Sequence, residues 1–376
     1  MNEPKQIVCF LGFLCGLSMP AWGQVQWSES PQVNNPVVTL TGSEQRAPAI
    51  ARDGHGGAII AWVDNRNGDS DIYAILLDAA GKLRWTQDGN AIAMANNDQE
   101  APAIVEGPDG GFFAAWQDRR NASSESQIFV QRFDADGQPV WTTETVAHTG
   151  NNSPPAILPN GAAGVITAAY ITSLDDDLIA FQFISESGVA QFDPRGILSL
   201  NAKGRQPDLP PAVTPALDGG LLAAWADARQ DTTVFAKGVL SDGSAWTAGE
   251  FSIGQGVVAG TFPVVVSDGT GGAIVAWLEP GFGGSDVLVK AARLDAAGRF
   301  VWSPGEQEVT ATSGPKRNLR IATDGGSGAF LAWETTVGPN AKVYLQRIDA
   351  SGAALTSDVN VSVAVGDQTQ PQLLYN

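Results

Sequence analysis

One short motif combines an aromatic ring, a carboxylate and a guanidinium at fixed spacing. Trp-x-Asp-x-Arg occurs three times, and Trp277 with Glu279 forms a partial copy. The full copies are Trp62-Asp64-Arg66, Trp116-Asp118-Arg120 and Trp225-Asp227-Arg229. An Asp and an Arg two residues apart can pair with each other or with nearby backbone and so fix a loop. Because a binding site usually combines unlike groups from different repeats, we interpret the motif as a structural clasp, with ligand contact as the alternative.

A second polar set stands just before the predicted first strand of each repeat. It mixes acids, bases and amides, which suits a polar ligand or an ion, although hydrated loop surface is the simpler interpretation. The candidates are Arg46, Glu100, Asn152, Asp208, Thr261, Arg317 and Thr369.

Metal and catalytic chemistry have few candidates. The loop Asp175-Asp176-Asp177 could bind calcium, but a solvated turn is simpler, so we expect no cofactor other than calcium. The two histidines, His55 and His148, lie outside any nucleophile-elbow pattern. A glycosidase needs only two carboxylates, and nothing in the sequence identifies such a pair, so the catalytic residues are unknown.

The chain that must position these side chains is acidic. It has 376 residues, with 40 acidic against 22 basic side chains and a net charge of −18. This excess repels phosphate backbones and anionic lipids, so nucleic-acid binding is not expected. Both cysteines, Cys9 and Cys15, lie near the N-terminus, which leaves the rest of the chain without disulfides or thiolate metal sites.

A unit of about 54 residues repeats along the chain. Its anchor positions are Pro48, Pro102, Pro155, Pro211, Pro263, Leu319 and Pro371. Each unit has an apolar stretch, a glycine turn with a second apolar stretch, an alternating run and a turn that carries tryptophan. Examples of the last three are Asp53–Trp62, Asp71–Asp78 and Asp78–Trp85. Four short antiparallel strands per unit of about this length are typical of a β-propeller blade.

The tryptophans support this assignment because those after residue 23 fall at two repeat positions. Five end the second strand: Trp62, Trp116, Trp225, Trp277 and Trp333. Five follow the turn after the third strand: Trp27, Trp85, Trp141, Trp246 and Trp302. Repeat three has Tyr170 and Phe192 nearby instead. We expect a structural role in which each ring covers the surface between blades and its N–H finds a carbonyl.

The turn Asp-Ala-Ala-Gly-x-x-x-Trp at Asp78–Trp85 and Asp295–Trp302, with Asp134–Gly137, resembles the tryptophan-docking motif of quinoprotein-type propellers. It is one residue shorter and lacks the threonine before glycine. It also resembles a relaxed Asp-box of sialidase-like propellers, with one residue too many between glycine and tryptophan. The resemblance covers about five short turns; it implies a propeller fold and no catalytic residue.

The strand count favours a six-bladed propeller of four-stranded antiparallel blades, with seven blades as the alternative. Second and third strands occur six times, but the first strand restarts at Gln370–Leu373 and an extra fourth strand is predicted within Val25–Leu40. Propellers commonly close by letting one terminus complete the other terminus's blade, which removes sheet edges.

Residues 1–23 have the layout of a secretory signal peptide. Lys5 precedes an apolar run at 7–17, and Ala21 and Gly23 stand at the −3 and −1 positions of a cleavage site. The run is too short to span a bilayer. We therefore expect residues 24–376 to form a single secreted or periplasmic β-propeller domain, a monomer that does not insert into membranes.

Three functions remain open. The first is an exported, non-enzymatic binding module whose partner is a glycan or an extracellular or periplasmic protein. The alternative is a propeller-type hydrolase or lyase that acts on carbohydrate through carboxylates on the face of the propeller where the loops after the second strands converge. The third is a repeat domain shed from a larger surface assembly.

Overall fold

The computed structural model describes most of the chain after residue 36. The described ranges are 37–121, 125–161, 163–172, 177–193, 196–201, 210–216, 218–227, 233–245, 251–258, 261–281, 286–310, 312–355, 357–362 and 365–373. The predicted signal peptide, Trp27, Trp246, Asp208 and Arg229 lie outside these ranges.

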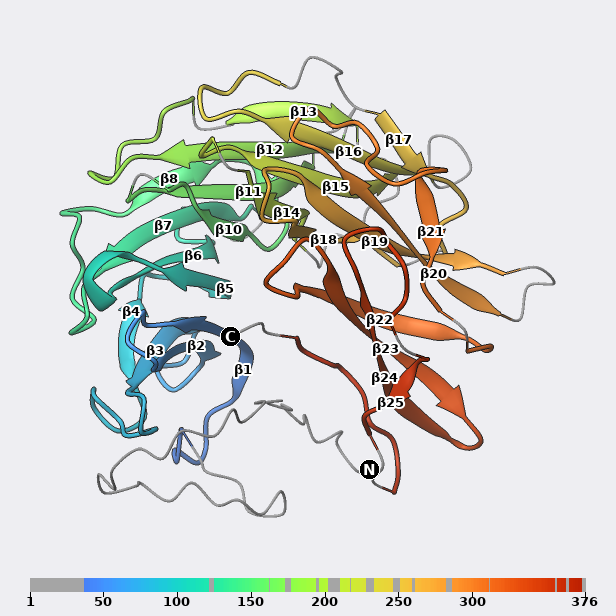
Figure 1. The fold of residues 1–376 in the computed structure, drawn as a ribbon. Coiled ribbons are helices and arrows are strands. Elements are labelled where there is room, and N and C mark those ends of the chain that lie inside the picture. Colours follow the sequence, from blue (N-terminus) through green and yellow to red (C-terminus); the bar gives the residue numbers. More distant parts are fainter. Residues whose placement is uncertain are drawn as a thin grey trace, which may run out of the picture. The chain divides into compact units, whose positions relative to one another are not determined.

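Six antiparallel sheets make up the fold, and in each the strands follow one another in chain order (Figure 1). The first three are β1 (Gln45–Arg52), β2 (Ala58–Asp64), β3 (Asp71–Leu77) and β4 (Asn90–Ala93); β5 (Gln99–Glu106), β6 (Phe112–Asp118), β7 (Gln127–Phe133) and β8 (Thr145–His148); and β10 (Ala156–Pro159), β11 (Val165–Thr172), β12 (Asp177–Ile184) and β13 (Ile197–Asn201). In the third sheet the short β9 (Asn151–Asn152) also pairs with β11.

The other three sheets repeat the same order. They are β14 (Ala212–Pro215), β15 (Leu221–Asp227), β16 (Thr233–Val239) and β17 (Phe251–Gly254); β18 (Val264–Ser267), β19 (Ala273–Pro280), β20 (Val287–Leu294) and β21 (Glu306–Glu308); and β22 (Lys316–Thr323), β23 (Ala329–Val337), β24 (Asn340–Ile348) and β25 (Val359–Asn360). One 3-10 turn, η1 (Pro108–Gly110), lies between β5 and β6.

These sheets are the blades of a six-bladed β-propeller, numbered one to six along the chain, so the predicted fold is confirmed. The seven-bladed alternative is wrong for the part described, which contains no seventh sheet. The chain divides into two compact units, one with blades one to three and the other with blades four to six. The predicted restart of the first strand at Gln370–Leu373 is not a strand in the structure, and neither are residues 37–40 of the predicted N-terminal strand, whose residues 25–36 lie outside the described ranges.

Second strands form the core between neighbouring blades of a unit. Ile59 and Ala61 of β2 pack in one cluster with Phe112 and Trp116 of β6. Leu222 and Ala224 of blade four pack in the same way with the next blade. Because both faces of the strand are buried, its sequence is a continuous apolar run rather than an alternating one.

Each second-strand tryptophan is buried and most stack on an aromatic ring directly across the sheet. Trp62, Trp116, Trp225 and Trp333 lie 6.0–6.4 Å, centroid to centroid, from their partners, which are Tyr73, Phe129, Phe235 and Tyr344. Trp277 pairs with Lys290 instead. In blade three the equivalent position is Ala169, and Tyr170 lies one residue further along, so it does not replace the tryptophan.

The tryptophans after the third-strand turn pack between blades. The indole N–H donates to a backbone carbonyl in the corresponding turn of the next blade, from Trp85 to Ala135, from Trp141 to Glu186 and from Trp302 to Ala350. Gly137, Gly188 and Gly352 face these rings. Phe192 occupies the equivalent position in blade three, where it contacts Phe183 edge-on.

Candidate functional site

In blade one the Trp-x-Asp-x-Arg motif closes on itself. The buried Asp64 carboxylate accepts hydrogen bonds from the Trp62 indole at 3.2 Å and from the Arg66 guanidinium at 2.5 Å. The guanidinium lies 3.8 Å above the Tyr73 ring. Burial of Asp64 opposes ionisation, but hydrogen bonds from Arg66 and Trp62 hold the pKa of its carboxyl at about 2.

Blade two repeats this arrangement with one addition. Asp118 accepts hydrogen bonds from Trp116 at 2.9 Å and from two nitrogens of Arg120, at 2.9 and 2.7 Å. Arg120 also donates to Glu144 at 2.7 Å. Burial disfavours the charged guanidinium, but these two carboxylates raise the pKa of Arg120 above its ordinary value. In both blades the charged groups of the motif are directed at each other, as a clasp requires.

The other blades depart from the motif. In blade four the backbone of Asp227 ends β15, and Arg229 lies outside the described residues. Blade five has Glu279 followed by Pro280 and Gly281, so no arginine follows the carboxylate. Burial raises the pKa of Glu279, with Lys290 opposing the shift and Glu306 adding to it.

A polar row, here called the rim, lies at the start of the first strands of blades one to three. Arg46 donates to Glu100 of the next blade at 2.6 Å and to the Ser70 hydroxyl at 3.2 Å. Arg119 lies 3.9 Å from the same carboxylate. About a third of each of these charged side chains is exposed, so the pair is reachable by a ligand.

Asn152 continues the rim into blade three. Gln117, the residue paired with Glu100 across the sheet, donates to the Asn152 carbonyl at 2.6 Å. The Asn152 amide nitrogen donates to the carbonyls of Ser126 and Gly150. Its Oδ1 is buried and accepts no hydrogen bond among the described residues. An unsatisfied buried acceptor costs free energy, and this oxygen is closed off from solvent in the structure.

A backbone irregularity recurs at the rim. Pairing shifts register after Arg46 and after Glu100, where Ala47 and Ala101 have φ of 51° and 50°. A bulge of this kind changes the direction of the neighbouring side chain. Its positive φ is a backbone conformation that residues other than glycine seldom adopt. It explains how Arg46 and Glu100, on separate strands, reach each other.

Arg317 occupies the same position in blade six but has a different partner. It donates from Nε to the buried Glu334 at 2.7 Å, and Asn318 donates to the other carboxylate oxygen at 2.7 Å. The Gln370 amide also donates to Glu334. Sequence reasoning missed Glu334, although it stands between Trp333 and Thr335 where the other blades have no acid.

The remaining candidates do not join a shared site. The Thr261 hydroxyl donates to the Val258 carbonyl at 2.8 Å, and Thr369 lies in a segment without strand structure. Asp208, Asp175 and Asp176 lie outside the described residues. Within the described ranges there is no cluster of three acidic, histidine or cysteine side chains with metal-binding geometry. A helix with the length and apolarity of a membrane span is also absent from those ranges.

Sequence reasoning also missed Arg119, Gln117 and Ser70 of the rim. Arg119 is the position between Asp118 and Arg120, and only the pairing of β5 with β6 brings it to Glu100.

No family model and no curated protein matches the sequence. Solved structures do match the fold. An ulvan lyase, described as a new family of polysaccharide lyase, is 8% identical over 83% of this chain and 83% of its own, with a TM-score of 0.51. An α-L-arabinanase of Penicillium chrysogenum is 14% identical over 81% of this chain and 93% of its own, with a TM-score of 0.44. A protein of unknown function from Dyadobacter fermentans is 10% identical over 83% and 96%, with a TM-score of 0.46. At these identities the likeness concerns the fold alone, and only the first of these TM-scores exceeds 0.5.

Proposed function

We propose that this protein is an exported glycan-binding module whose ligand contacts the rim of blades one to three. The observation that carries the proposal is the Arg46–Glu100 pair, each side chain about one third exposed, with Arg119 beside the same carboxylate. Unlike the clasps, the rim joins unlike groups from three blades. That combination is what a ligand site requires.

The chemistry of the rim suits sugar hydroxyls. Guanidinium, carboxylate and amide groups are planar and offer two donors or two acceptors side by side, which matches the hydroxyl pairs of a sugar ring. A hydroxyl can donate to the Glu100 carboxylate and accept from Arg46 or Arg119. The signal-peptide layout of residues 1–23 supports export to the secreted or periplasmic space.

Binding without catalysis is favoured by the state of the carboxylates. Glu100 makes ion pairs with both Arg46 and Arg119. Burial raises the pKa of Asp71, but this residue is 1% exposed and lies beneath Asn67, out of reach of a substrate. A glycosidase needs a reachable acid with a raised pKa and a second carboxylate.

A hydrolase or lyase is the second candidate, and Glu279 is the observation that favours it. Burial raises the pKa of this partly exposed carboxylate, and Glu306 and Glu308 add to the shift. A raised pKa in a group that can reach solvent suits a general acid.

A glycan-array screen of residues 24–376 tests the proposal, with release of reducing sugar measured on every hit. We expect binding without release, and at least about tenfold weaker binding for Arg46→Ala and Glu100→Gln, since each removes a charge-assisted contact. Arg52→Ala and Glu106→Gln are matched controls, because this 3.7 Å pair joins the opposite ends of the same two strands.

The controls should bind like the wild type. Equal loss in both pairs would mean that the rim variants act through folding rather than contact. Sugar release that Glu279→Gln abolishes would replace the binding module with the hydrolase.

A further inference from the structure

A groove lies between blades one and two at the end of β1 opposite the rim. It is here called the Trp85 groove and has a volume of about 480 Å³, within the range of small-molecule sites. Leu76, Ala79, Trp85 and Ala135 supply apolar surface. The polar lining comes from Asp53, His55, Asp78, Arg84 and Asp136.

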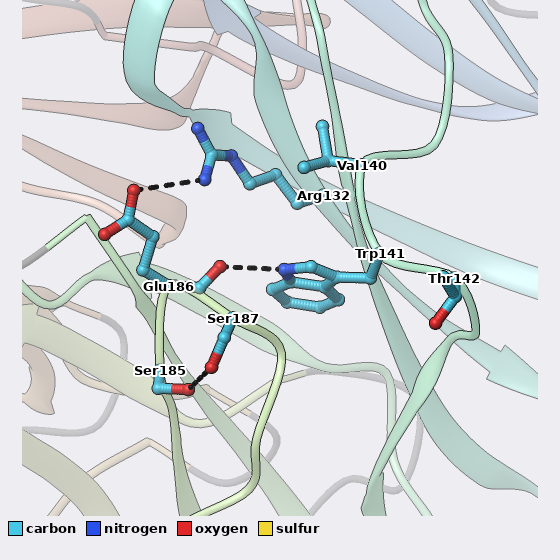
Figure 2. A pocket seen from close by; sticks show the side chains of 7 residues that line it. All are labelled: Arg132, Val140, Trp141, Thr142, Ser185, Glu186 and Ser187. Atoms are coloured by element: carbon cyan, nitrogen blue, oxygen red, sulfur yellow. Dashed lines mark hydrogen bonds and ion pairs between the residues drawn. The ribbon is translucent and has the colours of Figure 1, made fainter.

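The equivalent groove between blades two and three is spanned by an ion pair. In this Trp141 groove, of about 590 Å³, Arg132 lies 3.5 Å from Glu186, and the Ser185 and Ser187 hydroxyls are 3.0 Å apart. Figure 2 shows the Arg132 and Glu186 side chains meeting beside the Trp141 ring. Trp141 is only 7% exposed.

The Trp85 groove lacks this ion pair. Strand register places Leu76 where the Trp141 groove has Arg132, and Ala135 where it has Glu186. Trp85 is correspondingly more exposed than Trp141. The polar groups stand instead at the edges of the groove, where Arg84 replaces Val140 and Asp136 replaces Ser187.

These edge groups retain free hydrogen-bonding capacity. Within the described residues, neither the Arg84 guanidinium nor the Asp136 carboxylate has a hydrogen bond or an ion pair, and both are exposed. Asp78 uses Oδ1 for the amides of Ala80 and Lys82, which leaves Oδ2. The His55 ring uses Nδ1 near the Asp53 carbonyl, which leaves Nε2.

The charge of the lining selects among ligands. Three carboxylates against one guanidinium disfavour an anionic ligand such as a uronate or a sulfated sugar. An apolar floor with both donors and acceptors at its edges suits a ligand that has an apolar face and a hydroxyl-bearing rim. A pyranose ring has both.

We propose that the Trp85 groove binds one neutral pyranose residue, with its apolar face toward Trp85 and its hydroxyls on Arg84 and Asp136. The groove is a second sugar contact, separate from the rim because Arg46 and Asp53 stand at opposite ends of β1. At about 3.3 Å per residue, the two residues are about 20 Å apart. The proposal for the Trp85 groove is therefore independent of the proposal for the rim.

Saturation-transfer NMR on the folded protein tests the groove directly. The probes are methyl α-D-glucopyranoside, methyl α-D-mannopyranoside and methyl β-D-galactopyranoside, with D-glucuronate as the anionic comparison. We expect transfer to at least one neutral glycoside and none to glucuronate. Affinity should fall at least about tenfold in Arg84→Ala/Asp136→Ala, which removes both edge groups.

Two further variants keep the result interpretable. Leu76→Arg/Ala135→Glu copies the ion pair of the Trp141 groove into the Trp85 groove and should abolish glycoside binding. Glu186→Ala alters only the Trp141 groove and should leave glycoside binding unchanged. The proposal is overturned if no neutral glycoside binds, or if the groove variants bind like the wild type.

Discussion

Asp64 and Glu279 hold the same position in their blades but have opposite surroundings. Arg66 follows Asp64, and the pKa of Asp64 is held at about 2 although burial opposes ionisation. Pro280 and Gly281 follow Glu279, and burial raises its pKa because Lys290 compensates only in part. The nearby cation, rather than burial alone, therefore decides which of these carboxylates is stable in its charged form.

Removing the cation of the first clasp should make stability depend on pH. Arg66→Met leaves Asp64 buried without its charge partner, and we expect a loss of about 2–4 kcal/mol at pH 7. Because the folded-state pKa of Asp64 is lowered, its contribution is present above the unfolded value near 4 and is lost as pH falls toward 2. The difference between variant and wild type should therefore shrink over that window. Urea unfolding at a series of pH values measures it, and a difference independent of pH would contradict the assignment.

Glu279 should show the opposite sign. Its raised pKa means that folding favours the protonated form, so its ionisation lowers stability as pH rises from near 4.5 toward the folded-state value. Glu279→Gln removes the charge, and we expect a gain of about 1 kcal/mol or less at pH 7 and none at pH 4. Urea unfolding curves of the variant and the wild type at pH 7 and pH 4 give the two differences in the free energy of unfolding. A loss of stability at pH 7 would show that the charged form makes a net favourable contact.

At the scale of the blade, the turn glycines set how closely neighbouring blades approach. Gly188 has a φ of 83°, and a Cβ there would lie 2.6 Å from the Trp141 ring. Gly161, in the other turn of blade three, has a φ of 74° with open space around it. Both positions therefore require a positive φ, but only Gly188 lies against an indole ring.

This pair separates conformational strain from packing. We expect Gly161→Ala to cost about 1 kcal/mol, from the left-handed backbone alone. Gly188→Ala adds a clash with a buried indole, so its cost should be about 3 kcal/mol. Chemical denaturation of both variants gives the difference. Equal costs would mean that Trp141 moves aside freely and does not hold the blades together.

The strands of each blade could be predicted because local signals specify them. Apolar periodicity marked the second and third strands, and the turn aspartates are visible in the sequence because they cap their own turns, as Asp134 does for the amides of Asp136 and Gln138. The partners of the rim residues could not be predicted. Arg119 reaches Glu100, and Arg317 reaches Glu334, through strand register and bulges that no local pattern encodes.

At the scale of the whole molecule, the repeat organises the scaffold and its deviations mark the sites. Two clasps satisfy their own charges and recur with little change. The rim and the Trp85 groove arise where one blade differs from the next, as Arg46 differs from Glu100 and Leu76 from Arg132. The sequence therefore predicted the repeated structure well, whereas the two proposed sites depend on differences between blades whose effect appears only after folding.

The net charge of −18 leads to a prediction for the entire chain. The 22 basic side chains offset the charge of 22 of the 40 acidic ones. The remaining acidic side chains repel one another across the surface. Raising NaCl from about 0.01 to 0.1 M shortens the screening length from about 30 to 10 Å, which weakens this repulsion more than it weakens contacts such as Arg46–Glu100 at 2.6 Å. We therefore expect the melting temperature to rise steeply over that range and then level off, measured by differential scanning fluorimetry. Sucrose, which stabilises without screening, should give no plateau. A melting temperature that falls with added NaCl would mean that close ion pairs, rather than the acidic excess, dominate the electrostatic free energy of folding.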